Sequence, residues 1–322
     1  MAKILGMGNA LVDMLIQIDG DDFLEKNKLP KGSMQLVDWN TSSSILKMSE
    51  DFERSQASGG SAANTIHGLA KLGVETGFIG KVGKDEIGDF FKADLLDAGV
   101  KPELAESESK SGVAVALVSP DSERTFATFL GAAVEISADD LTSDMFEGYD
   151  YFHIEGYLVQ NYALIERAVQ LAKENNLKVS LDLASFNVVE DNLEFLQRIV
   201  KDYVDIVFAN EEEAKSFTGK EPEAALHAIA EVAEYAIVKI GSKGSMVKHN
   251  DKVYTAGVIK ANSIDTTGAG DLYASGFLFG LHKGVNLDEA ARIGSITAGN
   301  VIEVIGAKMD EKRWSKIYDM IG

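Results

Sequence analysis

The sequence predicts an α/β fold of three layers, α/β/α, around a mainly parallel central sheet, together with a small second β-sheet. The first observation is that apolar strand patterns alternate with amphipathic helix patterns from Tyr151 onward, which implies right-handed crossovers and helices on both faces of a sheet. The second is a pair of β-rich runs, 111–118 and 124–130, around the turn Ser119-Pro-Asp-Ser, which is typical of a hairpin. With 322 residues, 45% of them hydrophobic, the chain can bury a core of this size.

Three short segments precede the first long helix. Residues 3–8 have the pattern of a buried first strand that ends in glycines, and residues 11–18 alternate loosely around Asp13. Asp13 is either a local cap or a ligand for a substrate hydroxyl. A short strand within 34–38 is expected to join the 11–18 strand and the hairpin in the small sheet.

A small-residue loop, Ser58-Gly-Gly-Ser-Ala-Ala-Asn64, leads into an apolar helix pattern that stops at Gly73. The glycines at its start let the backbone approach a ligand closely, and Asn64 offers both a donor and an acceptor. The alternative interpretation is a plain glycine turn ahead of a packing helix. A short strand at 77–83 and a helix at 85–98 follow.

The second half of the chain predicts the main sheet. Strands are expected at 151–154, 178–182, 205–208 and 235–240, helices at 161–175, 191–201, 211–217 and 222–233, and a local hairpin from 246–248 and 253–255. In an open α/β sheet, ligands gather outside the carboxyl ends of the strands. Polar residues that directly follow these strands are therefore candidate site residues.

The stretch Asp265-Thr-Thr-Gly-Ala-Gly-Asp271 runs directly into a further apolar helix pattern. Gly268, Ala269 and Gly270 carry almost no side chain, so their N–H groups can close around an anion where helix donors and the positive dipole end coincide. Asp271 is placed to take a proton from an attacking hydroxyl. The alternative is that Asp271 only caps the helix and the glycines only form a turn.

Two polar clusters each follow a predicted strand. Asn210-Glu-Glu-Glu213 is either an Mg²⁺ site that works through bound water beside phosphates or simply the acidic first turn of a helix. Lys239-Ile-Gly-Ser-Lys-Gly244 either admits a base or a phosphate or forms a plain hairpin turn.

Composition and missing motifs exclude several classes of function. The formal net charge of −20 argues against nucleic-acid and anionic-membrane partners, because long-range repulsion opposes both. The chain has no cysteine and no apolar run near the ~20 residues of a membrane span, so a cytoplasmic location is expected. It has no P-loop, protein-kinase or HExxH motif, and Gly6-Met-Gly8 is an incomplete dinucleotide motif, since Leu11 stands at its third glycine position. The five histidines show no metal-ligand spacing.

Taken in order, these motifs resemble those of the ribokinase-like (pfkB-type) family of ATP-dependent sugar and nucleoside kinases. The 58–64 loop with Gly73 is similar to the first family motif, and 265–275 is similar to the second. The clusters at 210–213 and 241–244 fall where the family has its metal-linked and nucleotide-binding motifs. The resemblance extends from about residue 3 to Ala307, and it implies the ribokinase-like form of the predicted fold.

The resemblance implies a role for each matched residue. Asp271 would be the catalytic base, and Gly268, Ala269 and Gly270 would form the anion hole for the γ-phosphoryl group. The other implied contacts are substrate binding by Asp13, Gly59, Gly60, Asn64, Glu155 and Arg124; nucleotide binding by Asn210, Lys239, Gly241, Ser242, Gly244 and Asn300; and metal binding by Glu213, through water on Mg²⁺, and by Asp265, Thr267 and Gly306, which resemble a loop for a monovalent cation such as K⁺. The segment 300–307 departs from the alanine-rich pattern of ribokinase.

The resemblance also implies a division into a core and a lid. The nucleotide-binding core would comprise 1–13, 41–108 and 131–322, and a β lid of 14–40 and 109–130 would close over the substrate and exclude water. A monomer and a homodimer paired through the lids are both compatible with the sequence.

The expected activity is transfer of the γ-phosphoryl group of ATP to a hydroxyl of a small molecule. We favour a sugar as the acceptor, with adenosine as the close alternative because Gly8-Asn-Ala-Leu-Val-Asp13 is similar to the corresponding segment of adenosine kinases. A third alternative, from another class, is a sensor that binds a nucleotide or sugar without catalysis. The base at Asp271 argues against it, because a protein that only binds needs no base there.

Overall fold

The computed structural model describes residues 3–121 and 123–322; residues 1 and 2, and Ser122 at the end of the predicted hairpin turn, lie outside the described residues. Within those ranges the strands form a nine-stranded sheet and a five-stranded sheet. The large sheet runs, in spatial order, β14 (Lys252–Ala256), β13 (Ser245–His249), β12 (Tyr235–Lys239), β11 (Ile206–Asn210), β10 (Lys178–Asp182), β9 (Tyr151–Glu155), β1 (Ile4–Met7), β5 (Thr76–Gly83) and β6 (Val100–Ser107). The small sheet runs β3 (Met34–Leu36), β8 (Arg124–Phe129), β7 (Gly112–Val118), β2 (Leu11–Gln17) and β4 (Arg54–Gly59).

The large sheet is parallel from β6 to β12 and ends in the antiparallel pair β13 and β14. Its central strands are apolar on both sides because helices cover both faces. On β11, for example, Ile206 and Phe208 belong to one buried cluster while Val207 and Ala209 belong to the other. This confirms the predicted α/β class with a mainly parallel sheet.

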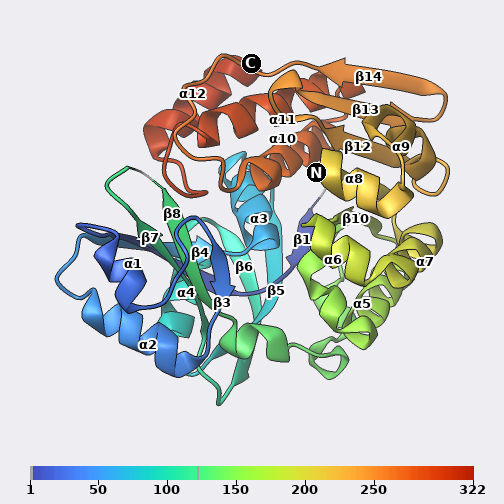
Figure 1. Ribbon diagram of the computed structural model, residues 1–322. Helices are drawn as coiled ribbons and strands as arrows, with labels where there is room; N and C mark the ends of the chain where they lie inside the picture. The colour runs from blue at the N-terminus through green and yellow to red at the C-terminus, as the bar shows by residue number, and fades with distance from the viewer. Residues whose placement is uncertain (1–2, 122) are drawn as a thin grey trace.

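Helices cover the two faces of the large sheet in separate layers (Figure 1). One layer contains α3 (Ser61–Lys71), α4 (Glu86–Asp97), α10 (Ala269–Lys283), α11 (Leu287–Val301) and α12 (Glu311–Ile321). The other contains α5 (Tyr162–Glu174), α6 (Phe186–Asp191), α7 (Leu193–Tyr203), α8 (Glu211–Thr218) and α9 (Pro222–Ile229). None of the helices described is long and apolar enough to cross a membrane.

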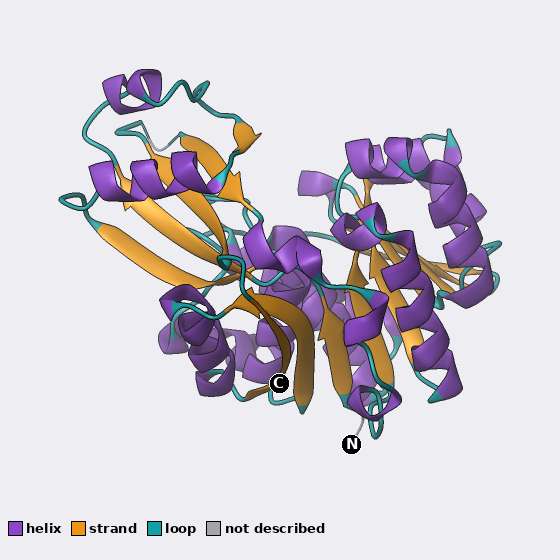
Figure 2. Cartoon of the chain, turned by 90° about the horizontal axis from the view of Figure 1, so that it is seen from below, coloured by secondary structure: helices purple, strands orange, loops and turns teal. Residues whose placement is uncertain are grey.

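The small sheet packs one face against its own helices, α1 (Asp22–Lys26) and α2 (Trp39–Met48). Leu24 and Ile45 from these helices contact Val113, Val115 and Leu117 of β7 in a third buried cluster. Figure 2 shows this unit to one side of the layered body. Helices α1 and α2 leave the opposite face of the small sheet uncovered, and that face can lie next to the carboxyl ends of the large sheet's strands.

The small sheet is larger than the boundaries drawn from the sequence. The predicted hairpin is confirmed, since β7 and β8 pair in antiparallel fashion. However, β4 lies inside 41–108, which we assigned to the core, and it pairs with β2 from Leu11 onward. Correctly drawn, the small sheet therefore also takes residues 11–13 and 54–59. Its motion as a lid stays a prediction.

Two strands were not predicted, and both lie at sheet edges. β4, Arg54-Ser-Gln-Ala-Ser-Gly59, is polar, and β6, at 100–107, contains Pro102. Edge strands bury little surface and tolerate proline, so they lack the apolar runs that mark central strands.

Candidate active site

Four polar side chains stand at the last positions of four adjacent parallel strands. Glu155 ends β9, Asp182 ends β10, Asn210 ends β11 and Lys239 ends β12. Asp182 pairs with Glu155 and Asn210 pairs with Lys239, while the second pair lies two residues further along because Asp182 pairs with Phe208 of β11. The sheet thus brings these groups to a single edge, as expected for an open α/β sheet.

The N-terminus of α10 faces the same edge and is built to receive an anion. Gly268 is its N-cap, with φ +75°, and a methyl group there would lie 2.6 Å from the Ala307 side chain. A methyl group at Gly270 would lie 3.0 Å from Lys239 Nζ. The glycines therefore leave room for a ligand between the first N–H groups of α10 and the Lys239 ammonium.

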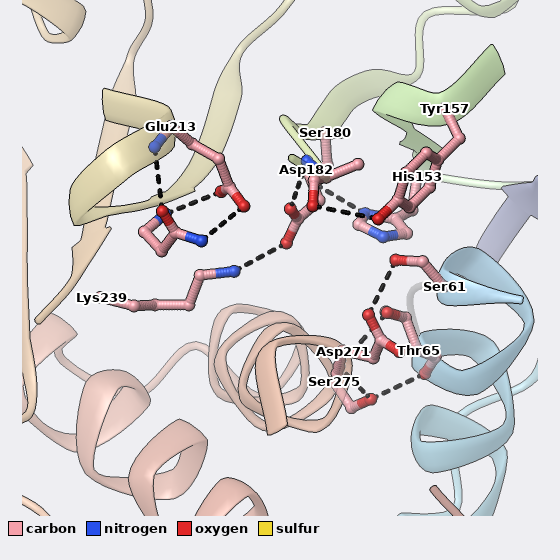
Figure 3. Close-up of polar contacts among 12 residues, drawn as sticks. Ser61, Thr65, His153, Tyr157, Ser180, Asp182, Glu213, Lys239, Asp271 and Ser275 are labelled. Atoms are coloured by element: carbon pink, nitrogen blue, oxygen red, sulfur yellow. Dashed lines mark hydrogen bonds and ion pairs between the residues drawn. The ribbon is translucent and has the colours of Figure 1, made fainter. Parts of the chain in front are cut away.

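Asp271, in the first turn of α10, is held by side chains of α3. Ser61 Oγ donates to its Oδ1 at 2.7 Å (Figure 3). Asn64 Nδ2 donates to its Oδ2 at 3.0 Å. Burial raises the pKa of Asp271 to about 6, although the hydrogen bonds from Ser61 and Asn64 oppose the rise. At neutral pH Asp271 is thus ionised yet basic enough to accept a proton from a hydroxyl.

Helices α3 and α10 are joined by further hydrogen bonds next to Asp271. Ser275 Oγ donates to the Thr65 carbonyl at 2.8 Å and to the Asp271 carbonyl at 3.0 Å, while Thr65 Oγ1 donates to that same Asp271 carbonyl at 3.2 Å. The 58–64 loop and the 265–275 loop, far apart in the sequence, therefore form a single rigid corner.

The glycine pair of the 58–64 loop makes a close approach to β1 and β2. A methyl group at Gly59 would lie 2.3 Å from the Asp13 carboxylate, and one at Gly60, with φ +94°, would lie 2.2 Å from the Asn9 carbonyl. Burial raises the pKa of Asp13 to about 7, with Lys308 opposing the rise. Asn64 Oδ1 has no hydrogen-bond partner among the described residues, so it is available to a substrate hydroxyl next to Asp13 and Asp271.

Glu155 supports this corner from beneath instead of facing open space. Its buried carboxylate accepts hydrogen bonds from Asn9 N at 2.9 Å, Asn9 Nδ2 at 2.7 Å and Ala62 N at 2.9 Å. The sequence predicts Glu155 as a substrate contact, whereas the structure gives its oxygens to the β1–β2 turn and the start of α3. Burial nevertheless raises its pKa to about 7.

Asp182, Glu213 and Lys239 form a second charged group beside the α10 N-terminus. Lys239 Nζ donates to Asp182 Oδ2 at 2.9 Å (Figure 3). Burial and the neighbouring Asp182 charge raise the pKa of Glu213 to about 7. Burial lowers the pKa of Lys239, but the carboxylates of Asp182 and Glu213 outweigh this effect and raise that pKa above its ordinary value.

Oxygen donors in this group fit an Mg²⁺ ion that is bound mainly by phosphates. Asp182, Glu213 and Asp271 interact electrostatically with a single Lys239, so negative charge is in excess. Within 3–121 and 123–322, no group of three or more His, Asp or Glu side chains is arranged to hold a metal by itself. Mg²⁺ keeps several waters and uses one or two carboxylates in such sites.

Asn210 and Glu213 also have a structural role at the start of α8. Asn210 Oδ1 accepts from Glu213 N at 2.9 Å, and Glu213 Oε2 accepts from Asn210 N at 2.8 Å. This reciprocal pair is a capping box. The alternative weighed from the sequence, an acidic helix start, is therefore present, and any Mg²⁺ role for Glu213 comes in addition to it.

The predicted nucleotide contacts differ in exposure, because the 241–244 turn is at the surface and Asn300 is buried. Gly241 and Ser242 are exposed in a tight turn after β12 that ends at Gly244, where a methyl group would lie 1.9 Å from the Ala256 carbonyl. Asn300, in contrast, is 0% exposed, and its Nδ2 donates to the Ile296 carbonyl at 2.9 Å. The α11–α12 packing covers this side chain in the structure, and the nucleotide role of Asn300 stays a prediction.

The remaining predicted residues meet at the entrance to the α10 loop. Arg124 of β8 forms an ion pair with Asp265, whereas the sequence predicts Arg124 as a substrate contact. Asp265 Oδ1 also accepts from Thr267 N at 2.9 Å, and Oδ2 accepts from Gly306 N at 2.6 Å. Burial alone would raise the pKa of Asp265, but these two N–H groups and Arg124 hold it below its ordinary value.

Three residues of the site were not singled out from the sequence. Asp182 is the last residue of a predicted strand, so the rule about carboxyl ends of strands was sufficient to find it. Ser61 lies inside the first motif. Lys308 had no signal in the sequence, because only the folded chain brings it near Asp13 and Asp271. Its buried Nζ has no hydrogen-bond partner among the described residues. Burial lowers the pKa of Lys308 to about 8.

Comparisons with known proteins agree with this geometry. The profile of the pfkB family of carbohydrate kinases matches residues 37–313. The chain is 30% identical to an uncharacterized sugar kinase from Archaeoglobus fulgidus, over 75% of this chain and 96% of that protein. Two crystal structures are similar: a probable sugar kinase from Rhizobium etli CFN 42 (TM-score 0.88, 30% identity, 99% and 98% of the two chains) and the adenosine kinase from Sinorhizobium meliloti (TM-score 0.87, 31% identity, 99% of both).

Proposed function

The chain belongs to the pfkB family of carbohydrate kinases, and we propose that it phosphorylates a hydroxyl on the ribose of a ribonucleoside with ATP as the donor. Members of this family are phosphotransferases that act on sugar or nucleoside hydroxyls. Sequence alone favoured a free sugar as the acceptor. The face of the small sheet beside Asp13 changes that preference.

The observation that carries the proposal is an apolar face of the small sheet next to Asp13, Asn64 and Asp271, the residues proposed to bind the substrate hydroxyls. Strand registers align Leu15, Ala116, Phe126 and Met34 in a row across β2, β7, β8 and β3. The neighbouring row aligns Asp13, Ala114, Thr128 and Leu36. Residues two apart on a strand share a face, so both rows lie on the face that carries Asp13.

This face is open where it is most apolar. Met34 is 59% exposed and Leu36 is 64% exposed, while helices α1 and α2 cover the other face. A flat base stacked on Phe126 and Leu36 would bury this surface, with its ribose directed toward Asp13. A free sugar would leave the apolar surface in water, which is unfavourable.

Asp271 is the proposed base. With its pKa at about 6, it is mainly ionised at pH 7 and can take the proton as the substrate hydroxyl attacks. A phosphoryl-transfer transition state is loose, so accurate positioning and charge neutralisation dominate the rate. Ser61 and Asn64 fix the carboxylate, which keeps one oxygen directed at the reacting hydroxyl.

The α10 N-terminus and Lys239 are the proposed holders of the transferred group. The N–H groups of Ala269 and Gly270 begin the helix, and Lys239 Nζ stands across from Gly270. These positive groups would stabilise the charge on the γ-phosphoryl oxygens. Asp182 and Glu213 would hold Mg²⁺ through its waters, and the bound ion would neutralise the β- and γ-phosphates.

A sugar acid is the second candidate acceptor, and Lys308 is the observation that favours it. Its buried amine lies near Asp13 and Asp271 without a hydrogen-bond partner among the described residues. A carboxylate on the substrate would supply that partner. The apolar face has no role in this alternative.

A panel of acceptors distinguishes the candidates. ADP release is measured with adenosine, inosine, ribose, fructose and a six-carbon sugar acid, on wild type, Leu36→Ser and the control Leu96→Ser, an exposed leucine on α4. The proposal predicts the highest kcat/KM with a nucleoside. It also predicts a KM for that nucleoside that rises roughly tenfold in Leu36→Ser alone, as expected for about half the burial energy of a leucine.

Other outcomes overturn the proposal in different ways. Preference for the sugar acid, lost in Lys308→Met, would establish the second candidate. Turnover of free ribose at the nucleoside rate would remove the role of the apolar face. No turnover with any acceptor, together with measurable ATP binding, would favour a sensor.

A further inference from the structure

Arg124 is the one contact described so far that joins the small sheet directly to the α10 loop. It lies at the start of β8, on the same sheet face as Asp13, because it pairs in register with Val118 in the row beyond Phe126. Its ion pair with Asp265 is largely shielded from water, with the two side chains 12% and 4% exposed. Arg124 therefore connects the small sheet to the loop that precedes α10.

Asp265 links this ion pair to the anion-binding loop, Gly268–Gly270. Its Oδ1 accepts from Thr267 N, directly before Gly268, and its Oδ2 accepts from Gly306 N. The next residue, Ala307, packs against Gly268. The carboxylate thus fixes both segments that shape the N-terminus of α10.

The family resemblance places a monovalent cation beside Asp265, Thr267 and Gly306, and these residues do not fit one here. One Asp265 oxygen already carries an N–H donor and the Arg124 guanidinium, and the other carries a short N–H contact. A K⁺ ion at this carboxylate would stand beside a fixed positive charge, and the two like charges would repel each other. Guanidinium is permanently charged and well suited to a largely dehydrated carboxylate.

We infer that Arg124 takes the place of the monovalent cation, so that the small sheet itself supplies the charge that orders the anion-binding loop. Arg124 is a positioning residue: it acts on the transferred phosphoryl group only through Asp265 and the Gly268–Gly270 backbone. The enzyme would therefore need no K⁺. Ordering of the loop would depend on the small sheet holding Arg124 against Asp265. The inference rests on the proposed phosphoryl transfer only for its kinetic test.

The test compares potassium chloride with tetramethylammonium chloride at constant ionic strength. Wild type, Arg124→Ala, Arg124→Lys and Arg198→Ala are used, the last being a control because Arg198 pairs with Glu166 on an exposed surface. Thermal unfolding is followed without nucleotide, and ADP release is followed with the best acceptor. The unfolding measurement remains informative even if no acceptor is turned over.

Wild type and Arg198→Ala are expected to show the same Tm and kcat in both salts. Arg124→Ala, which frees the carboxylate, is expected to gain Tm in K⁺ by specific binding and to recover kcat at least about fivefold. Arg124→Lys keeps a positive charge and is expected to stay independent of K⁺.

Two results overturn the inference. The first is a wild type whose Tm or kcat rises saturably with K⁺, because the cation would then bind beside Arg124; this arm needs no variant to fold. The second is a folded Arg124→Ala that responds to neither salt, because the contact would then be structural only. Absence of turnover in wild type and in every variant, together with a Tm of Arg124→Ala that rises in K⁺, would contradict the proposed function and leave the inference standing.

Discussion

Asp265, in the loop before α10, and Asp271, in the first turn of that helix, have opposite electrostatic settings. Asp265 is surrounded by donors, namely two backbone N–H groups and Arg124, and its pKa lies below the ordinary value. Asp271 has two neutral side-chain donors, and burial raises its pKa to about 6. The same type of side chain is thus a fixed anion at position 265 and, in our proposal, a base at position 271.

The difference comes from what each carboxylate is paired with. A buried carboxylate that is fully matched with N–H groups and a cation has no tendency to take a proton. One that is buried with weaker partners stays basic near neutral pH. Asp265 therefore organises the loop, and Asp271 is left free to react. Each of the following predictions would break or sharpen this comparison.

Replacing the proposed base, Asp271, gives the largest expected effect. In Asp271→Asn the amide cannot accept the proton, so kcat is expected to fall by about 10³-fold or more, within the range for general-base catalysis and positioning. Binding of a non-hydrolysable ATP analogue, measured by calorimetry, is expected to stay near the wild-type value. Asp288→Asn, the same exchange at an exposed position of α11, is the control. A variant that keeps most of its rate would show that Asp271 is only a cap.

Replacing the fixed anion acts mainly on stability. Asp265→Asn leaves the largely buried Arg124 beside a neutral amide, which is expected to cost about 3 kcal/mol of unfolding free energy. Urea unfolding checks this value. Glu166→Gln breaks the exposed pair with Arg198 and is expected to cost under about 1 kcal/mol. Equal losses of unfolding free energy in the two variants would mean that the Arg124–Asp265 pair is no more important for stability than an exposed ion pair.

The pH dependence of activity follows from the raised pKa of Asp271. The reactive form is the carboxylate, so kcat/KM is expected to be constant well above pH 6 and to fall about tenfold per unit below it. Asp13 and Glu155, each with a pKa raised to about 7, interact with the Asp271 charge, so the apparent pKa belongs to the group. A rate that rises as the pH falls from 7 to 5 would rule out a carboxylate base.

The smallest effect is expected from Ser61→Ala. The Ser61 hydroxyl lowers the pKa of Asp271, so its loss should move the acid limb of the rate profile to higher pH. The rate at pH 6 should fall a few-fold, as expected for one hydrogen bond to a charged group, while the rate at pH 8 stays almost unchanged. Equal losses at both pH values would show that Ser61 acts by positioning and not on the pKa.

The sequence predicted the parts of this site that have a local signature. The small-residue loops at 58–64 and 265–271 mark helix starts that leave backbone N–H groups open, and folding brings both to Asp271 as expected. The central parallel strands carried continuous apolar runs, so their positions along the chain and the α/β class were also predictable. The polar edge strands β4 and β6 had no such runs and were missed.

Roles that depend on long-range partners were not predictable. Glu155 has the same chemistry whether it faces a substrate or the N–H groups of Asn9 and Ala62, and only the fold decides between them. Asn300 lies four residues from Ile296, whose carbonyl it bonds, and the packing of α12 then encloses it. Arg124 and Asp265 are joined by no sequence pattern at all.

The most direct test of the comparison is to titrate the two carboxyl groups themselves. With ¹³C-labelled aspartate, the two carboxyl resonances can be assigned by their loss in Asp271→Asn and Asp265→Asn and followed by NMR as the pH is varied. The account predicts that Asp271 titrates near pH 6 while Asp265 remains ionised below the usual range for aspartate. An Asp271 that titrates at or below its ordinary value, or an Asp265 that titrates above it, would contradict the assignment of one as base and the other as fixed anion.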